Sequence, residues 1–426
     1  MFGRDASFLI RGYVTVLVAF GGSLMTGLSD RVGLLRISPI RRVTALLDEA
    51  RNKGDIVSFG GGAPSLPPAK EVLDEMCSQL QRQPLRSSAY TGTKGLPELR
   101  QLISEDIKKY GKLDYKAERE IIITDGGTEA IFSLFMSLLN KNDEVIILDP
   151  TYLGYNEAIK LAGGRVRTLL VKVEEGYQPT VEKLKELITD RTRAFILLSP
   201  DNPTGRVVSE VFVKGLVDLA ADYDFWIIAD DTYKHIIYEG EHVWVARLPG
   251  ASERTVMLCS FSKDASVPGL RLGYALGPPQ IIDAMEKMKQ YTSLAPSTLS
   301  QMGMIRFLSD GVKERYLRDV VIPTYRERME FMGECVKKHL PEAKTSRPAG
   351  AFYYFVDMSS YLSKMQRDDE AFCERLLYRK NVAVIPGSFF GKGGERHVRM
   401  TFVSEPRERM ELGVKAIAEY VFSYTF

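Results

Sequence analysis

The sequence predicts an α/β protein with a large domain built on a mostly parallel seven-stranded sheet and a smaller α+β domain. The first observation is that seven short apolar runs alternate with amphipathic stretches between about Glu120 and Gly277. Continuous apolar strands separated by helices are typical of parallel sheets that helices cover on both faces. The second is a long helical stretch, from Pro279 to about Arg328, which leads into three further apolar runs.

Each predicted strand is a short apolar run between helical patterns. The seven runs of the large domain are Ile121–Thr124, Glu144–Asp149, Arg165–Val171, Ala194–Ser199, Phe225–Asp230, Thr255–Ser260 and Leu272–Leu276. The three runs of the small domain are Ala351–Met358, Asn381–Gly387 and His397–Val403. We expect residues 25–64 to form an N-terminal arm that packs with the small domain, residues 65–305 to form the large domain, and residues 306–426 to form the small one.

Composition narrows the classes of function. Of the 426 residues, 45% are apolar and 26% are charged, with a net charge of +2, which is typical of a globular protein with an ample core. No basic cluster indicates a nucleic-acid partner. The four cysteines lie far apart and form no CxxC pair. We therefore expect neither a disulfide framework nor a zinc site, and a cytoplasmic location.

The first residues allow two interpretations. Arg4 and Arg11 precede the apolar run Gly12–Gly22, as in a weak signal peptide. The run is too short to cross a membrane, and no A-x-A cleavage site follows it. Met25 opens a stretch that looks like an ordinary protein start. We expect residues 1–24 to be an upstream extension of the reading frame, and no membrane partner.

The informative residues follow the predicted strands, at the edge where ligands of parallel sheets bind. After the first strand comes the segment Asp125–Thr128, with two glycines that open a helix. The N–H groups of such a turn suit a phosphate, although many such turns are only tight connections. After the second strand comes Tyr152, which could stack on a flat ligand or simply pack in the core.

Three later strand ends carry further polar groups. Asn202 lies in the turn "PDNPTG", which turn chemistry alone would also explain. Asp230 ends an apolar strand, where a buried carboxylate is costly unless a cation faces it. Lys263 follows another strand, with Ser260 before it and Arg271 after it. A lysine in an apolar pocket loses its proton readily and suits a Schiff base, although most lysines are simply solvated.

Together these groups match the needs of one cofactor. Successive strand ends carry a phosphate cradle, a stacking ring, a donor for a ring oxygen, a carboxylate for a ring nitrogen and an amine for an aldehyde. This set indicates pyridoxal 5′-phosphate, which proteins hold through a Schiff-base lysine and an acidic partner of the pyridinium nitrogen.

Five motifs resemble the class I and II aminotransferases of the aspartate aminotransferase fold, called fold type I. They are "AYTGTKGLPELR" (Ala89–Arg100), "SPDNPTGRV", "ADDTYKHI", "SFSKDASVPGLRLGY" (Ser260–Tyr274) and "HVRMTF", in this order. The resemblance covers nearly everything from Leu28 onward, and the pattern is nearest to archaeal-type aromatic and 2-aminoadipate aminotransferases. It implies a pyridoxal-phosphate-dependent aminotransferase that moves an amino group from an L-amino acid to a 2-oxo acid by a ping-pong mechanism.

The resemblance also implies roles around the cofactor ring. Lys263 matches the lysine that binds the cofactor covalently and later moves the proton. Asp230 matches the carboxylate that keeps the pyridine nitrogen protonated. Tyr233 and Asn202 match the donors to the phenolic oxygen of the ring, and Tyr152 matches the aromatic residue stacked on its face.

Other matches concern the phosphate and the substrate. The phosphate-binding set of the family matches Gly127, Thr128, Ser260 and Arg271. Tyr90 matches a tyrosine that reaches the phosphate in the neighbouring subunit, which implies a homodimer with shared sites. Arg399 matches the arginine that binds the substrate α-carboxylate as a bidentate fork, and Gly62 matches a glycine whose backbone lies near that carboxylate.

Substrate preference depends on which cation can bind the distal carboxylate of an acidic substrate. One branch of the family has a lysine where this chain has Thr128, and another uses an arginine in the stretch that matches Gln290–Gln301, which here carries no positive charge. Arg41, with Arg42 as the second choice, matches a mobile arginine that meets acidic side chains, although it could be a solvated residue at a helix start. We expect aromatic or large apolar donors with 2-oxoglutarate as acceptor.

Several alternatives remain open at this point. The same fold and residues also serve C–S lyases and synthases, and an aspartate-preferring aminotransferase is a further possibility. A regulator built on this fold would usually add a DNA-binding domain, for which no room exists before Leu28. The four histidines, His235, His242, His339 and His397, show no metal spacing, so we expect no metal, and Asp231 is expected to be a local hydrogen-bonding residue.

Overall fold

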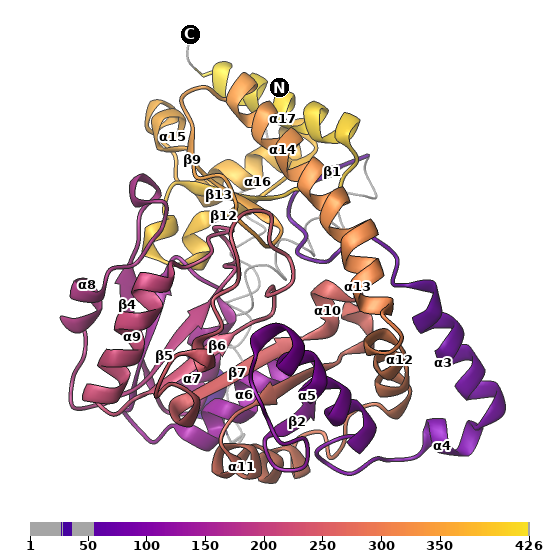
Figure 1. Ribbon diagram of the computed structural model, residues 1–426. Helices are drawn as coiled ribbons and strands as arrows, with labels where there is room; N and C mark the ends of the chain where they lie inside the picture. The colour runs from indigo at the N-terminus through magenta and orange to yellow at the C-terminus, as the bar shows by residue number, and fades with distance from the viewer. Residues whose placement is uncertain (1–26, 28, 36–54, 425–426) are drawn as a thin grey trace, which may run out of the picture. The chain divides into compact units, whose positions relative to one another are not determined.

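The computed structural model describes Gly27, residues 29–35 and residues 55–424 (Figure 1). The chain divides into two units, Met1–Leu35 and Arg36–Phe426. The described part of the first unit contains one helix, α1 (Asp30–Leu34), and the side chain of Ser29 caps it by accepting a hydrogen bond from the backbone N of Arg31. Residues 1–24 and most of the predicted arm lie outside the described residues.

The second unit contains the predicted sheet of seven strands. They run in the spatial order β2-β8-β7-β6-β5-β3-β4, and only β8 is antiparallel to its neighbours. The strands are β2 (Ile121–Thr124), β3 (Glu144–Asp149), β4 (Arg165–Leu170), β5 (Thr192–Leu198), β6 (Trp226–Asp230), β7 (Thr255–Ser260) and β8 (Gly273–Leu276). The prediction of a mostly parallel seven-stranded sheet is confirmed, and each strand lies within two residues of its predicted bounds.

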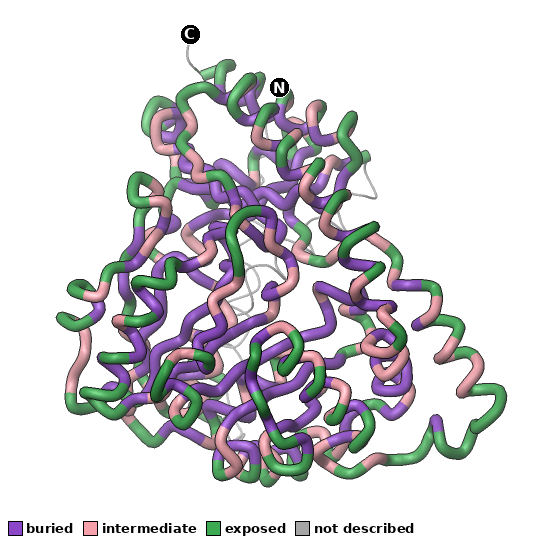
Figure 2. Tube along the Cα trace, viewed as in Figure 1, coloured by how far each residue is buried: buried purple, intermediate pink, exposed green. Residues whose placement is uncertain are grey.

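Burial explains why the inner strands read as unbroken apolar runs. Every residue of β2, β7 and β8 is buried, because helices cover the sheet (Figure 2). The edge strand β4 differs, since most of its residues are partly or fully exposed and two of them are arginines. Charged side chains on an edge strand prevent pairing with another sheet.

Helices from several parts of the second unit pack on this sheet. Helix α6 contacts β2, β7 and β8, and it also packs against α7 and α11, whereas α9 contacts β6 and packs against α8. Helices α3 and α4 pack against α12 (Thr298–Leu308) instead of the sheet. The helices of this part of the chain are α3 (Lys70–Arg82), α4 (Pro84–Ser88), α5 (Pro97–Gly111), α6 (Gly127–Leu138), α7 (Gly154–Leu161), α8 (Val181–Lys185), α9 (Glu210–Asp222) and α11 (Pro279–Gln290).

The predicted long helical stretch after Pro279 is not continuous. Helix α11 ends at Gln290, and α12 (Thr298–Leu308) begins only after a loop in which Leu294 has a φ of 66°. Helix α13 (Val312–Tyr316), the π-helical segment η6 (Leu317–Val321) and α14 (Ile322–His339) follow one another without a break. A helix thus runs from residue 312 to residue 339, beyond the predicted end at Arg328.

The C-terminal part combines a small sheet with helices. Its four antiparallel strands run in the order β12-β13-β10-β9, and β1 pairs in parallel with β11. The elements are β1 (Val57–Ser58), β9 (Lys344–Thr345), β10 (Tyr353–Asp357), β11 (Val382–Ala383), β12 (Ile385–Pro386), β13 (His397–Thr401), α15 (Ser359–Met365), α16 (Asp369–Lys380) and α17 (Arg407–Phe422). The segment that begins at residue 55 therefore joins strands more than 300 residues away in the sequence.

Candidate active site

The predicted lysine stands directly after a buried strand. Lys263 belongs to the short helix α10 (Phe261–Asp264), which follows β7 without a loop. The side chain of Ser260 caps this helix by accepting a 3.2 Å hydrogen bond from the backbone N of Ser262. Because Ser260 ends the strand and caps the helix, the position of Lys263 relative to the sheet is well determined.

The Lys263 side chain lies among aromatic rings and makes one strong hydrogen bond. Its Nζ donates to the backbone oxygen of Gly62 at 2.5 Å, and it lies 5.8 Å from the ring centre of Tyr233 and 5.9 Å from that of Phe352. Burial lowers the pKa of Lys263, and the positive charge of Arg399 contributes to the same shift. The amine is therefore neutral more often than that of an exposed lysine.

Asp230 ends strand β6 with two neutral partners. Its Oδ2 accepts a 2.7 Å hydrogen bond from the hydroxyl of Tyr155, and its Oδ1 accepts one of 3.1 Å from the backbone N of Thr232. Burial raises the pKa of Asp230, and these two hydrogen bonds oppose the rise. Among the described residues, no lysine, arginine or histidine forms an ion pair with this carboxylate, so a cation that enters the site would stabilise it.

Two tyrosines, Tyr233 and Tyr353, lie next to a buried arginine, Arg399. The hydroxyls of Tyr233 and Tyr353 lie 2.9 Å apart and share a hydrogen bond. The guanidinium carbon of Arg399 lies 4.4 Å from the ring centre of Tyr353 and 5.0 Å from that of Phe390. These rings form the apolar walls around the guanidinium group.

The Arg399 side chain is held in a fixed direction without an acidic partner. Only 1% of it is exposed, and it donates to Oδ1 of Asn202 at 3.0 Å and to the backbone oxygen of Gly60 at 2.8 Å. Its Nε is buried without a hydrogen-bond partner. No carboxylate in the described part of the chain forms an ion pair with it, so the guanidinium keeps its charge available for an anion.

The turn that carries Asn202 has its own support. Asp201 is completely buried, and its Oδ2 accepts hydrogen bonds from the backbone N and the hydroxyl of Thr204, at 3.1 and 2.6 Å. Its Oδ1 lies 3.5 Å from Nη2 of Arg206, which is also buried. This arrangement holds the backbone on both sides of Asn202.

The predicted phosphate cradle lies at the start of helix α6. A Cβ atom on Gly126, whose φ is +85°, would come within 2.5 Å of Nη2 of Arg271, so the guanidinium lies directly against the turn. A Cβ on Gly127 would lie 3.6 Å from Cβ of Ser260. Thr128 follows in the first turn of the helix and is exposed. The structure therefore brings these residues together, with the unpaired N–H groups of the helix start beside them.

The predicted aromatic residues differ in exposure. Tyr152 is partly buried and packs edge-on against Tyr155, with ring centres 5.4 Å apart. A Cβ on Gly154 would lie only 2.4 Å from the Tyr152 ring, which explains a glycine at that position. Tyr90, by contrast, is 83% exposed.

The remaining residues singled out from the sequence are two arginines and the histidines. Arg41 and Arg42 lie outside the described residues. His242 Nε2 lies 3.2 Å from Oδ1 of Asp231, and His235 Nε2 lies 3.8 Å from Oδ2 of Asp106, too far for a hydrogen bond. No group of three or more histidine, cysteine or acidic residues is arranged for a metal within the described ranges.

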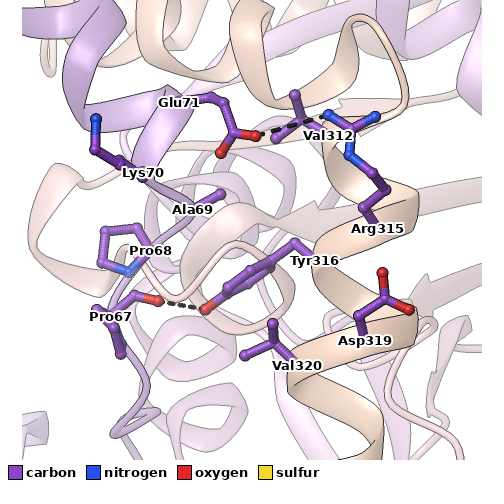
Figure 3. A pocket seen from close by; sticks show the side chains of 10 residues that line it. All are labelled: Pro67, Pro68, Ala69, Lys70, Glu71, Val312, Arg315, Tyr316, Asp319 and Val320. Carbon is purple, nitrogen blue, oxygen red and sulfur yellow. Dashed lines mark hydrogen bonds and ion pairs between the residues drawn. The ribbon is translucent and has the colours of Figure 1, made fainter.

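A separate surface pocket lies between the start of α3 and the segment α13–η6 (Figure 3). Its volume is about 340 Å³, and the hydroxyl of Tyr316 donates a 2.6 Å hydrogen bond to the backbone oxygen of Pro67 at its wall. It contains none of the predicted site residues and has no buried charged group without a partner. We assign it no role.

The motifs missed several residues that shape the site. Tyr155, Tyr353 and Phe352 each contact a predicted residue but belong to none of the family motifs, and Gly60 contacts Arg399 although only its neighbour Gly62 was predicted. Tyr155 left one usable signal, since a tyrosine on a buried helix face needs a partner for its hydroxyl. The role of the Gly60 backbone oxygen could not be read from the sequence, because every residue has the same acceptor.

None of the helices in the described part of the chain combines the length and the apolar character that crossing a membrane requires.

Comparisons with known proteins agree with this geometry. The family model of aminotransferase class I and II matches residues 54–417. The aspartate/prephenate aminotransferase of Thermus thermophilus is 33% identical over 381 residues, which are 89% of this chain and 95% of that protein.

Solved structures agree as well. The structure of aspartate aminotransferase from Thermus thermophilus with maleate has a TM-score of 0.86 and 32% identity, and the match covers 93% of this chain and 100% of that one. The aromatic aminotransferase from Pyrococcus horikoshii OT3 has a TM-score of 0.82 and 28% identity, with 89% and 99% coverage.

Proposed function

The chain belongs to the class I and II aminotransferase family, and from this premise we propose that Lys263, Asp230, Tyr233 and Arg399 are the central residues of its active site. The enzyme is a pyridoxal-phosphate-dependent aminotransferase of fold type I. The observation that carries our assignment is a pair of unmatched buried charges. Among the described residues, no cation forms an ion pair with Asp230 and no carboxylate forms one with Arg399, while Lys263, with a lowered pKa, belongs to the same aromatic-lined region.

These residues fit pyridoxal phosphate. Because Gly126 has no Cβ atom, the guanidinium of Arg271 can lie directly against the glycine turn, and Ser260 lies beside Gly127. A phosphate at this turn would meet a cation, a hydroxyl and the N–H groups of the helix start. Asp230 offers a negative charge for the ring nitrogen, and Lys263 offers an amine for the aldehyde. When bound, the cofactor supplies a ring that accepts the electrons released when the substrate loses its α-proton.

Each protein group then has a distinct task. Asp230, oriented by Tyr155, holds a proton on the ring nitrogen, because a cation facing a buried carboxylate lowers the free energy of both. The hydroxyl of Tyr233, which shares a hydrogen bond with that of Tyr353, would donate a hydrogen bond to the phenolic oxygen of the ring. Lys263, neutral more often than an exposed lysine, accepts and returns the proton of the substrate carbon.

The substrate carboxylate is expected to bind at Arg399. The guanidinium is buried between the Tyr353 and Phe390 rings, and Asn202 and Gly60 fix its direction. A carboxylate can accept from such a fork with two parallel hydrogen bonds. The backbone oxygen of Gly62 lies close to the side chains of Lys263 and Tyr353, and we expect the backbone of Gly62 to lie near the same carboxylate.

For the amino donor, we favour aromatic or large apolar amino acids, with 2-oxoglutarate as acceptor. Thr128 provides no charge for a distal carboxylate, and the stretch Gln290–Gln301 contains no cation. The lysine just before it, Lys289, is buried and paired with Asp125 and Glu129, so it is not available to a substrate. Arg41 remains the cation that we propose for the acceptor's distal carboxylate.

A second candidate is an enzyme that prefers aspartate. The relatives named for aspartate and prephenate, and a similar structure solved with maleate, favour it, whereas the match to an aromatic aminotransferase favours the first candidate. The test is a panel of amino acids, each mixed with 2-oxoglutarate, with glutamate and the new 2-oxo acid both quantified. Turnover of aspartate far above that of every aromatic donor would select the second candidate, and release of ammonia without glutamate would indicate lyase chemistry instead.

The variant Arg41→Ala should distinguish substrates with an acidic side chain from those with an apolar one. Its loss should raise KM for glutamate and 2-oxoglutarate and leave phenylalanine and leucine unaffected, which is the pattern of a lost binding contact. Arg42→Ala serves as the matched control at the adjacent position. An equal loss for all substrates would reject Arg41 as the cation for acidic side chains.

We also propose a homodimer with shared sites, in the cytoplasm. Tyr90 is exposed in the single chain, and the hydroxyl of Thr298 donates a 2.5 Å hydrogen bond to the backbone oxygen of the adjacent Ala89, which fixes the segment from which Tyr90 projects. Tyr291, at 90% exposure, and Leu85, at 89%, are further large side chains without cover in one chain. Burial of such side chains between two copies would stabilise the pair.

A further inference from the structure

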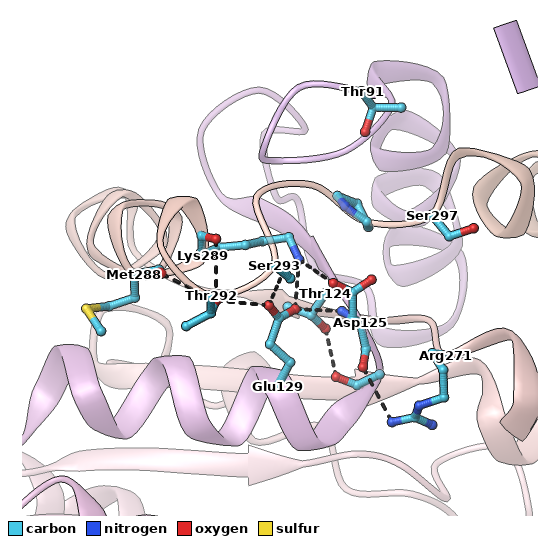
Figure 4. Close-up of polar contacts among 12 residues, drawn as sticks. Thr91, Thr124, Asp125, Glu129, Arg271, Met288, Lys289, Thr292, Ser293 and Ser297 are labelled. Carbon is cyan, nitrogen blue, oxygen red and sulfur yellow. Dashed lines mark hydrogen bonds and ion pairs between the residues drawn. The ribbon is translucent and has the colours of Figure 1, made fainter. Parts of the chain in front are cut away.

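A buried lysine forms a polar cluster next to the phosphate cradle (Figure 4). We call Lys289, Asp125, Glu129, Thr292 and Ser293 the Lys289 cluster. Lys289 lies in the last turn of α11, Asp125 lies just before the glycine turn, and Glu129 lies in the first turn of α6. Thr292 and Ser293 belong to the loop that follows α11. The cluster thus joins two loops that are some 160 residues apart.

The ammonium group of Lys289 is fully used within the cluster. Only 1% of the Lys289 side chain is exposed, and its Nζ donates to Oδ2 of Asp125 at 3.0 Å, to Oε2 of Glu129 at 2.8 Å and to Oγ of Ser293 at 2.7 Å. An ammonium group has three donors, so all are satisfied. A buried charge persists only with such partners, and loss of the ammonium group would leave the two carboxylates without a cation.

The cluster holds the backbone just before the cradle from several directions. Oε2 of Glu129 accepts a 2.6 Å hydrogen bond from the backbone N of Asp125, and Nη2 of Arg271 donates to the backbone oxygen of Asp125 at 3.4 Å. The side chain of Asp125 is bound by Lys289. The residue preceding Gly126 is therefore fixed at its N–H, its carbonyl and its carboxylate.

The loop that follows α11 is bound to the carboxylate of Glu129. Oγ of Ser293 donates to Oε1 of Glu129 at 2.5 Å, and the hydroxyl of Thr292 lies 3.3 Å from the same oxygen. The backbone oxygen of Lys289 accepts hydrogen bonds from the backbone N atoms of Thr292, Ser293 and Leu294. Glu129 thus receives hydrogen bonds from both sides of the cluster. The positive charge of Lys289 balances one of the two carboxylate charges in the cluster.

We propose that Lys289 is a positioning residue for the phosphate end of the cofactor. The proposal rests on the function proposed above, in which the turn at Gly126 and Gly127 binds the phosphate. Lys289 acts in two ways: it fixes Asp125 and thereby the direction of the N–H groups that follow, and it compensates carboxylates that would otherwise repel a phosphate dianion. Both effects concern the phosphate and not the pyridine ring.

The test compares pyridoxal phosphate with pyridoxal, which lacks the phosphate. The full-length chain, freed of cofactor, is titrated with each ligand, and the absorbance that appears on binding gives the two dissociation constants. For Lys289→Met we expect the affinity for pyridoxal phosphate to fall by about tenfold or more, as for one lost charge-assisted hydrogen bond. The affinity for pyridoxal should change less than about threefold. Inorganic phosphate should also compete less well with pyridoxal phosphate in the variant.

A matched control is Lys313→Met. Lys313 is another buried lysine, paired with Asp106 away from the cradle, so its loss should destabilise the fold without changing the ratio of the two affinities. If Lys289→Met does not fold, Lys289→Gln keeps a donor but not the charge, and should still lose affinity selectively for the phosphorylated ligand. Circular dichroism and the melting temperature establish that each variant is folded.

The outcomes separate this inference from the proposed function. Equal weakening of both ligands, or no change in either, in a folded Lys289 variant overturns the positioning role while leaving the active-site assignment intact. An unaltered chain that fails to bind pyridoxal phosphate at Lys263 would reject the active-site assignment itself.

Discussion

The hydroxyl of Tyr155 donates a 2.7 Å hydrogen bond to Oδ2 of Asp230, which links helix α7 to the end of strand β6. Both side chains are buried, so no water competes for the carboxylate at this position. The hydrogen bond orients the carboxylate and lowers its pKa against the effect of burial. Asp230 can then keep its negative charge toward a ligand that approaches from the strand end.

Tyr155→Phe should reduce turnover by about ten- to a hundredfold, since a hydrogen bond to a charged group is lost. Without this bond the pKa of Asp230 rises further, so the acidic limb of the pH–turnover profile should move to higher pH. Tyr177→Phe is the matched control, because the buried Tyr177 hydroxyl has no hydrogen-bond partner among the residues that the structure describes. An unshifted acidic limb in Tyr155→Phe would show that this hydrogen bond does not tune the carboxylate.

Asp230→Asn should slow proton abstraction by about 10²–10⁴-fold, because the amide cannot keep a ring nitrogen protonated. Single-turnover kinetics with an amino acid, followed by absorbance, measure this step directly. Asp231→Asn is the control at the next position, where the carboxylate faces His242 instead of the site. Near-normal rates in Asp230→Asn would mean that another residue performs this task.

Lys263→Ala should lose essentially all turnover yet still bind pyridoxal phosphate without a covalent bond. The unaltered protein should be yellow, and borohydride should attach the cofactor irreversibly to the peptide that contains Lys263. Peptide mass spectrometry identifies the site. Attachment to a different lysine would refute the assignment.

Arg399→Lys should raise KM for amino acid donors by about ten- to a hundredfold, because a lysine cannot form the planar fork that binds a carboxylate twice. The matched probe is the amine that corresponds to a good donor without its carboxylate. Reaction with this amine should be slow in the unaltered enzyme and no slower in the variant. If the variant loses both reactions in proportion, Arg399 supports the fold instead of the carboxylate.

Mixed dimers test the shared site. Tyr90→Phe and Lys263→Ala subunits, inactive or weak alone, should regain activity when mixed, because one site of each heterodimer would carry neither change. Native mass spectrometry establishes that heterodimers form. Heterodimers without recovered activity would contradict a Tyr90 that reaches into the partner's site.

Much of the fold could be predicted because the inner strands of a parallel sheet are buried on both faces. Their unbroken apolar runs identified the strands of the large sheet, and β2, β3 and β7 begin and end at the predicted residues. The interruption after α11 was missed, since the loop from Tyr291 to Ser297 contains only Pro296 as a strong helix breaker. The π-helical join at Leu317–Val321 was also missed, because helical periodicity does not distinguish it.

The sequence by itself determined which chemical groups stand at the strand ends. Lys263, Asp230, Asn202 and the glycine turn each end or directly follow a predicted strand, so their order along the chain was enough to place them there. Only the tertiary structure decided how these groups are supported. Tyr155 reaches Asp230 across 75 residues, Lys289 reaches Asp125 across 164, and Arg399 reaches the backbone oxygen of Gly60 across 339. Such contacts depend on the packing of whole elements and often on backbone atoms that every residue shares, so no local pattern of side chains records them.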